Sequence, residues 1–338
     1  MPEHKTLNTK GMHQKKVLIM GGAGFIGTVL SPYLHDAGYD VTVADACWFG
    51  NYLPSHIKLI QTDLFDLKKE DLVPYDSIIF LAGLSNDPMA EFSPKSNFIL
   101  NTALPSYIGF LAREAGVKKM IFASSCSVYG YTLNKTYTEE DPAICNYPYG
   151  VSKLQGERSL LALAEENFRV VCIRQGTVCG YSPRMRLDLA MNTMFKNAIQ
   201  NHKITLSNHR IWRPILGLND LCEGYKQAIE FDQEGGHIFN LSSFNTTVGE
   251  LATSVIGFVK EKMNIDVAIE DQNVQDYRNY KVSTEKAKNL LHYNAKQNDL
   301  DIISELYNNL SSFSDFTDER FFNIQVFKKL VHDNPLLS

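Results

Sequence analysis

A tyrosine and a lysine stand four residues apart in the segment "YPYGVSK", which runs from Tyr147 to Lys153. Residues with this spacing lie on one face of a helix, so Tyr149 and Lys153 can act together if the segment is helical. An ammonium group beside a phenol favours the phenolate and lowers the phenol pKa from about 10 towards neutral. Such a tyrosine can take a proton from an alcohol, which predicts a general base at Tyr149.

A serine-rich segment, "SSCSVYG" (124–130), follows an apolar stretch that is typical of a buried strand. Ligands of open α/β sheets bind beyond the carboxyl ends of the strands. We therefore expect Ser125 to hydrogen-bond a substrate hydroxyl beside Tyr149, with Ser127 as its neighbour.

A glycine-rich segment, "MGGAGFIG", directly follows the first predicted strand and opens a predicted helix. Gly21, Gly24 and Gly27 have the spacing GxxGxxG. Glycines at these positions let the chain turn tightly and approach a pyrophosphate, whose charge then faces a helix N-terminus. Together with the strand-then-helix context, this pattern predicts a dinucleotide-binding loop.

Two aspartates end neighbouring predicted strands. Asp45 closes the second strand, where a carboxylate can accept hydrogen bonds from the adenosine ribose and would repel a 2′-phosphate. The cofactor is therefore predicted to be NAD and not NADP. Asp63 ends the third strand and is expected near the adenine.

The elements that must position these residues alternate between strands and helices. This alternation predicts an α/β fold of the Rossmann type, a doubly wound parallel sheet with helices on both faces. Predicted helices cover about 94–116 and 149–167. The predicted strands are 15–20, 41–45, 57–63, 77–83, 119–125, 169–175 and 237–243.

The pattern loosens after Cys179, which predicts a smaller C-terminal substrate-binding domain. The expected organisation is a flexible tail over 1–14, an NAD-binding domain over 15–180 plus about 216–245, and a second, substrate-binding domain over 181–215 plus about 246–338. A chain of 338 residues can bury cores for both domains.

Composition excludes several classes of protein. A net charge of -5 without long basic runs argues against nucleic-acid binding. No apolar stretch is long enough for a membrane span. The six cysteines form no CxxC pair and no zinc-type cluster, so we predict no metal site. Free thiols without an apolar signal segment indicate the cytoplasm.

Taken together, these motifs resemble the extended short-chain dehydrogenase/reductases of the NAD-dependent nucleotide-sugar epimerase/dehydratase family. The resemblance spans residues 17 to about 245 and rests on "GGAGFIG", Asp45, Asp63, "FLAG" (80–83), Asn101, "SSCSVYG", "YGVSK" and "FNLSS". It implies a catalytic triad in which Tyr149 is the base, Lys153 tunes it and holds the nicotinamide ribose, and Ser125 orients the sugar. The implied cofactor contacts are Gly21, Gly24, Phe25, Ile26, Gly27, Asp45, Asp63, Leu64, Leu81, Ala82, Gly83, Asn101, Tyr149 and Lys153.

The resemblance implies that the substrate is a nucleotide-diphosphate sugar and that the domain over 181–215 plus about 246–338 binds it. Arginine side chains suit phosphate oxygens, and Arg213 and Arg278 match family positions that contact the substrate diphosphate. The predicted substrate contacts are Ser85, Ser127, Thr177, Arg184, Arg186, Asn192, Arg213 and Arg278. The family also implies a homodimer that pairs the helices near 94–116 and 149–167.

The reaction is narrowed by residues that are absent. Family members that eliminate water resemble one another in an Asp-Glu pair after the catalytic serine or threonine, and Cys126 and Ser127 stand there instead. A nucleotide-sugar 4-epimerase that acts through a transient 4-keto sugar is the leading prediction. A 4-dehydrogenase or 4-ketoreductase is the alternative, because "RQGTVCG" (174–180) lacks an asparagine usual in 4-epimerases. A non-catalytic NAD-binding regulator is the remote alternative.

Overall fold

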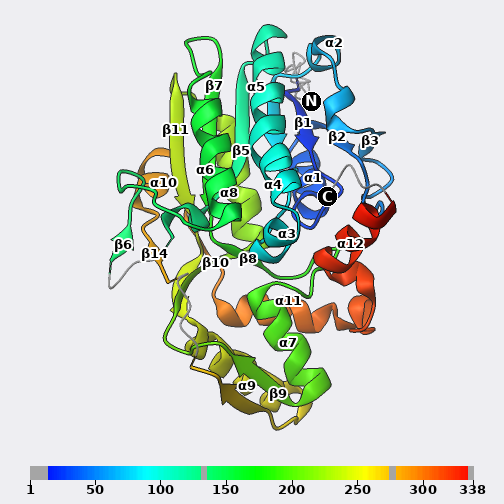
Figure 1. The fold of residues 1–338 in the computed structure, drawn as a ribbon, viewed down its shortest axis with the longest axis vertical. Coiled ribbons are helices and arrows are strands. Elements are labelled where there is room, and N and C mark those ends of the chain that lie inside the picture. The colour runs from blue at the N-terminus through cyan, green and yellow to red at the C-terminus, as the bar shows by residue number, and fades with distance from the viewer. Residues whose placement is uncertain (1–13, 131–134, 274–278, 334–338) are drawn as a thin grey trace, which may run out of the picture.

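The computed structural model describes residues 14–130, 135–273 and 279–333. Its main sheet contains seven parallel strands in the order β11-β7-β5-β4-β1-β2-β3 (Figure 1). The strands are β1 (Lys16–Met20), β2 (Asp40–Asp45), β3 (Lys58–Gln61), β4 (Ser77–Phe80), β5 (Lys119–Ser125), β7 (Arg169–Gln175) and β11 (Gly236–Leu241).

The strand order reverses beside β1, which pairs with β2 on one side and β4 on the other. Val17 of β1 is in register with both Val41 and Ser77. A crevice forms outside the carboxyl ends of the strands at such a switch point, and ligands of α/β sheets bind there.

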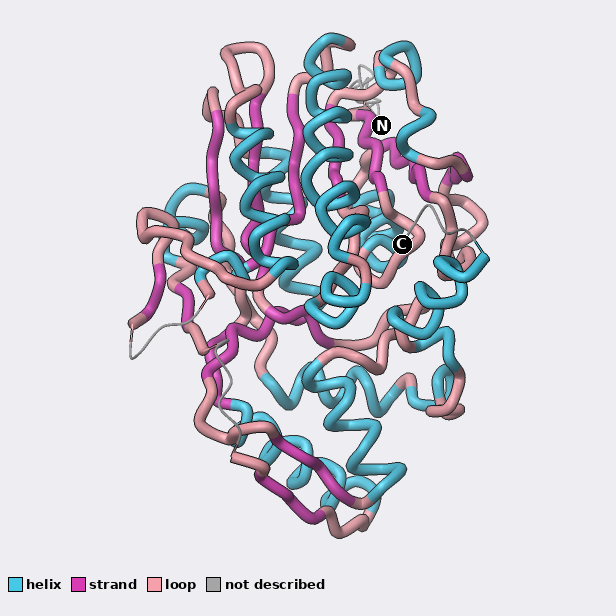
Figure 2. Tube along the Cα trace, viewed as in Figure 1, coloured by secondary structure: helices cyan, strands magenta, loops and turns pink. Residues whose placement is uncertain are grey.

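The helices cover both faces of this sheet because its strands are apolar on both faces. In β1, Val17 faces one core, and Leu18 faces the other. The first core is covered by α1 (Gly27–Asp36) and α8 (Leu218–Glu230), and the second by α5 (Leu104–Glu114) and α6 (Pro148–Leu161). The tube drawing shows the second pair of helices lying along the strands (Figure 2).

The predicted helix near 94–116 is interrupted at Asn101. A π-helical turn, Ile99–Ala103, joins α4 (Pro94–Phe98) to α5. Asn101 is fully buried, and its Nδ2 donates to the Leu84 carbonyl (3.0 Å) and to the hydroxyl of Ser152 (3.2 Å). Such π turns are frequent at functional sites. Here the turn links α6 to the loop that follows β4.

The smaller part lies beyond the carboxyl ends of the main strands (Figure 1). A capping box is present in it, because Glu250 N donates to Thr247 Oγ1 (3.1 Å) and Thr247 N donates to Glu250 Oε2 (2.9 Å). The elements are β8 (Thr177–Cys179), β10 (Trp212–Gly217) and β12 (Phe244–Thr247) in one sheet, β9 (Lys203–Leu206) and β13 (Ala268–Asp271) in another, and α7 (Ala190–Asn201), α9 (Val248–Met263) and α11 (Asp299–Asn308).

The division into two domains stays a prediction, and the strands near its boundaries alternate between sheets. β10 and β12 belong to the small sheet, whereas β11, between them in sequence, joins the main sheet beside β7. Several short elements complete the described fold. They are α2 (Lys69–Leu72), α3 (Asp87–Phe92), β6 (Thr136–Tyr137), β14 (Lys281–Val282) and α10 (Glu285–Leu290).

The last described helix, α12 (Asn323–Asp333), returns to the main sheet (Figure 1). Its Phe327 is fully buried and contacts the rings of Trp48 (5.9 Å between centroids) and Phe92 (6.1 Å). Within the described ranges, no helix combines the length and the apolar character that crossing a membrane requires.

Candidate active site

A cleft of about 650 Å³ lies at the carboxyl ends of the main strands. Its walls come from the glycine loop, from the ends of β2, β4 and β5, from α6, and from the segments that follow β7 and β8. Most of the residues singled out in the sequence therefore meet in one place.

The glycine loop makes one end of this cleft. Gly21 has a φ of +80°, and a Cβ there would lie 2.5 Å from the backbone nitrogen of Ala82. A Cβ on Gly27 would lie 2.3 Å from the Gly22 Cα, so α1 begins against the loop itself. Gly27 supports the loop from below and does not line the cleft. This close backbone packing at a helix N-terminus fits the pyrophosphate of a dinucleotide.

Asp45 is held at the same end by two backbone N–H groups. Its Oδ2 accepts from Ala23 N (2.9 Å), and its Oδ1 accepts from Cys47 N (2.6 Å). Burial raises the pKa of Asp45, and the two backbone hydrogen bonds and the charge of Arg184 oppose that rise. Asp63 also lines the cleft, and its Oδ1 accepts from Phe65 N (3.0 Å).

The three predicted catalytic side chains come together in the middle of the cleft. Ser125 ends β5, Tyr149 lies in the first turn of α6, and Lys153 follows one turn later. A hydrogen bond joins the hydroxyls of Tyr149 and Ser125. Lys153 Nζ donates to the Ala123 carbonyl (3.0 Å), which fixes the lysine against β5.

The pKa of Tyr149 differs from the expectation drawn from its spacing to Lys153. Burial raises the pKa of Tyr149, and this effect outweighs the hydrogen bond with Ser125 and the charge of Arg186, which lower it. Burial also lowers the pKa of Lys153 to about 7. The spacing correctly predicted that the two residues share one face of a helix, but burial in apolar surroundings sets the direction of both pKa shifts.

Most of the other predicted contacts also line the cleft. On the cofactor side these are Gly24, Phe25, Ile26, Leu64, Leu81, Ala82 and Gly83, and on the substrate side Ser85, Ser127, Thr177, Arg184, Arg186 and Arg213.

Three predicted contacts, Gly27, Asn101 and Asn192, do not line the cleft in the described structure, and a fourth lies outside that structure. Asn101 stands behind the cleft wall. Asn192 is fully buried, and its amide bonds the backbone of Gly180 (3.1 and 3.0 Å) and the Arg186 carbonyl (2.9 Å). Asn192 therefore shapes the loop that carries the arginines, and the geometry does not support a direct substrate contact. Arg278 lies outside the described residues.

The sequence analysis missed several residues that line the cleft. The Tyr280 hydroxyl is 3.4 Å from Ser127 Oγ, and the Arg213 guanidinium lies 5.8 Å from the centre of the Tyr280 ring. Asp188 pairs with Arg186 (2.8 Å). Asn323 of α12 donates to Ser85 Oγ (3.0 Å). The sequence analysis singled out the nearby Arg184, Arg186 and Arg278, but no local pattern distinguishes Tyr280 or Asp188 from surface residues.

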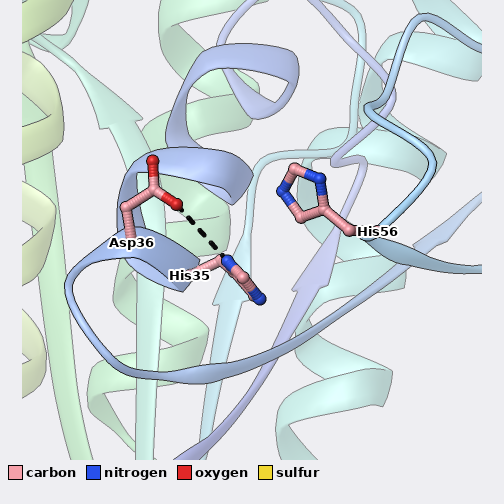
Figure 3. A group of neighbouring side chains, drawn as sticks. All are labelled: His35, Asp36 and His56. Carbon is pink, nitrogen blue, oxygen red and sulfur yellow. Dashed lines mark hydrogen bonds and ion pairs between the residues drawn. The ribbon is translucent and has the colours of Figure 1, made fainter.

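A surface cluster of potential metal ligands lies apart from the cleft (Figure 3). The side chains of His35, Asp36 and His56 are exposed, and their ligand atoms all lie within 4.8 Å of one another. His35 Nδ1 is 3.4 Å from the Asp36 carboxylate, and the two imidazole centroids are 4.7 Å apart. We assign no metal here, because exposed groups of this kind are common without an ion and none of the three lines the cleft.

The fold and the cleft define a dinucleotide-binding protein of the Rossmann type, with a Ser-Tyr-Lys constellation at the carboxyl ends of its strands. Residues 17–242 match the NAD dependent epimerase/dehydratase family, and the chain belongs to this family. A UDP-glucose 4-epimerase of Azospirillum brasilense is 30% identical over 178 residues, which cover 51% of each chain. A UDP-glucose 4-epimerase of Corynebacterium glutamicum is 24% identical over 86% of this chain and 94% of its own.

Solved structures share the fold. A UDP-glucose 4-epimerase of Thermus thermophilus in complex with NAD superimposes with a TM-score of 0.76 at 21% identity, over 88% of this chain and 99% of its own. MoeE5 in complex with UDP-glucuronic acid and NAD gives a TM-score of 0.75 at 23% identity, over 86% and 97%. The predicted family, Rossmann fold and NAD dependence are confirmed, and the predicted enzyme class agrees with these relatives.

Proposed function

We propose that this protein is a nucleotide-sugar 4-epimerase in which Tyr149 is the catalytic base. One observation carries the proposal: the hydrogen-bonded Tyr149 and Ser125 lie in the same cleft as the glycine loop and Asp45. A sugar placed against the two hydroxyls would share the cleft with the cofactor. The 4-epimerases among the relatives support a sugar linked to uridine diphosphate.

The chain's own residues account for the proton transfer at C4. Ser125 Oγ accepts from Ser127 N (3.1 Å) and donates to Ser127 Oγ (3.0 Å), and both serines line the cleft with Tyr149. Tyr149 removes the proton of the C4 hydroxyl as a transient 4-keto sugar forms. It returns that proton after the ketone has presented its opposite face. When bound, NAD supplies a hydride acceptor and donor, and the positive charge of its oxidised ring favours the phenolate.

Elimination of water is disfavoured at this site. Cys126 occupies a position where dehydratases of the family carry an acidic residue, and its thiol is buried and donates to the Arg174 carbonyl (3.1 Å). Burial raises the pKa of Cys126 far above the neutral range. Neither this thiol nor the Ser127 hydroxyl replaces a carboxyl acid-base pair.

A 4-dehydrogenase or 4-ketoreductase is the second candidate, favoured by Thr177. This residue lines the cleft in the segment that carries an asparagine in the usual 4-epimerases. Both reactions begin with proton removal by Tyr149, but a dehydrogenase releases the ketone. A non-catalytic NAD-binding regulator is a remote candidate, because the chain keeps the complete triad.

The test is to incubate the full-length protein with UDP-glucose, UDP-glucuronic acid and their N-acetylated relatives in the presence of NAD. NADH absorbance and inversion at C4 are followed separately, the latter by NMR. Inversion without net NADH is expected of the epimerase. Formation of NADH in stoichiometric amounts, together with a released ketone, would show that the protein is a dehydrogenase and not an epimerase. No turnover with any of these sugars would contradict both proposed reactions.

We also propose that the protein works as a homodimer in the cytoplasm. Two aromatic residues of α5, Tyr107 and Phe110, are 43% and 47% exposed, and a partner subunit packed on this helix would cover them. All six cysteines are free thiols, as a reducing compartment would keep them.

A further inference from the structure

The two arginines of the segment "SPRMRLD" (182–188) have different neighbours in the cleft, although the sequence predicted one role for both. Arg186 forms two hydrogen bonds with Asp188 (2.8 and 3.1 Å), and its charge acts on Tyr149. Arg184 is instead placed where its charge acts on Asp45, the predicted ribose ligand. The charges of the two arginines also act on each other, but only Arg186 acts on Tyr149 and only Arg184 acts on Asp45.

Arg184 is buried without a full set of partners. It is only 2% exposed, and its guanidinium lies 4.0 Å from the centre of the Phe49 ring. Its Nε and Nη2 are buried and have no hydrogen-bond partner among the described residues. Burying unpaired N–H groups of a cation is destabilising. Burial accordingly lowers the pKa of Arg184 to about 9. A side chain held this way needs an anionic acceptor in the cleft that it lines.

The segment that carries Arg184 is fastened to the start of α1. Ser182 is fully buried, and its Oγ donates to the Phe25 carbonyl (2.7 Å) and lies 2.8 Å from the hydroxyl of Thr28. These contacts hold the arginine segment over the glycine loop, where this fold receives a pyrophosphate. The helix N-terminus and the guanidinium would thus act on the same anion.

We propose that Arg184 binds the diphosphate of NAD and not the diphosphate of the nucleotide sugar. A guanidinium presents a planar fork of N–H donors that matches phosphate oxygens. The diphosphate of the nucleotide sugar is instead expected near Arg213, whose guanidinium lies by the ring of Tyr280, a neighbour of Ser127. The proposal concerns the cofactor alone and does not depend on which sugar reaction the protein catalyses.

The experiment compares Arg184→Gln with Arg213→Gln in the full-length protein freed of dinucleotide. Calorimetric titrations use three probes: NAD, ADP-ribose and UDP. ADP-ribose keeps the cofactor's diphosphate without the nicotinamide, and UDP carries the diphosphate of the proposed substrate. Arg184→Gln should weaken the binding of NAD and of ADP-ribose by about tenfold to a hundredfold, because charge-assisted hydrogen bonds to the diphosphate are lost. The affinity of this variant for UDP should change by less than about threefold. Arg213→Gln should show the reverse pattern.

Thermal unfolding separates binding from a structural role. If Arg184 serves a ligand, Arg184→Gln should leave the melting temperature of the cofactor-free protein unchanged or raise it, because an unpaired buried charge is removed. The rise in melting temperature on adding NAD should shrink. Unchanged NAD affinity, an equal loss for NAD and UDP, or a loss for UDP alone would each overturn the proposal.

Discussion

The Arg174 guanidinium and the Glu157 carboxylate form a buried ion pair with two hydrogen bonds, Nη2 to Oε1 (2.6 Å) and Nε to Oε2 (3.0 Å). Their side chains are 4% and 1% exposed. The Ser124 hydroxyl also donates to Glu157 Oε2 (2.8 Å). Glu157 lies one helical turn after Lys153 in α6, and Arg174 lies in β7, so the ion pair holds α6 against β7. The hydrogen bond from Ser124, which precedes Ser125 in β5, holds the same helix against the strand that carries the third catalytic residue.

Glu157→Gln should lower the free energy of unfolding by about 3–5 kcal/mol, because it leaves the Arg174 charge buried without its partner. Urea denaturation measures this change. The control is Glu166→Gln, which alters an exposed glutamate just beyond α6 and should change stability by less than about 0.5 kcal/mol. Equal stability of the two variants would contradict a structural role for the ion pair.

Tyr149→Phe should reduce turnover by at least about a hundredfold, because it removes the proton acceptor and keeps the ring. NAD affinity and the circular dichroism spectrum should stay those of the unaltered protein. Initial rates with the sugar identified by the substrate screen provide the measurement.

Tyr147→Phe is the matched control for this variant, since Tyr147 stands just before α6 and does not line the cleft. It should leave the chemical step nearly unchanged. Lys153→Met should reduce both turnover and NAD affinity. Full activity in Tyr149→Phe would rule out the proposed base.

The unaltered protein should bind NAD more tightly than NADP, and Asp45→Ala should narrow that preference. The carboxylate is held by Ala23 N and Cys47 N, so its charge is fixed where a 2′-phosphate would have to lie. Titration of each dinucleotide against the cofactor-free protein checks both statements. Asp45→Asn keeps the shape of the side chain and removes its charge, so this variant tests whether the charge causes the preference. Equal or tighter binding of NADP by the unaltered protein would refute the prediction.

The protein should be a dimer at micromolar concentration, and Phe110→Glu should make it monomeric. Tyr107 and Phe110 present an aromatic surface on α5, and a buried carboxylate would make its association unfavourable. Light scattering after size-exclusion chromatography gives the mass. The control is Leu300→Glu, since Leu300 is a similarly exposed apolar residue on α11. A monomeric unaltered protein would exclude this interface.

Glu305→Gln should stabilise the protein at pH 8 and have little effect near pH 5. Burial raises the pKa of Glu305 to about 7, so the folded state holds the proton that the unfolded state releases above its ordinary pKa. Stability is therefore fully present at low pH and falls as the pH rises to about 7, by up to about 3 kcal/mol. Urea denaturation at the two pH values tests this, and equal effects at both would contradict it.

The sequence by itself determined the parts of the site that are built from neighbouring residues. The strand, glycine loop and helix around Gly21 follow from apolar runs and glycine spacing, and the shared face of Tyr149 and Lys153 follows from helical periodicity. The position of Asp45 at a strand end could be predicted because this residue directly follows an apolar run of strand length.

Only the tertiary structure decided which distant segments meet this framework. In the folded chain, Tyr280 lies beside Ser127, and the charge of Arg184 acts on Asp45. The Asn192 amide hydrogen-bonds backbone groups, and Asn323 of α12 lies beside Ser85. It also set the direction of the Tyr149 and Lys153 pKa shifts. The physical reason is that burial and long-range contacts depend on how whole layers pack, whereas local spacing reports only on one helix or strand.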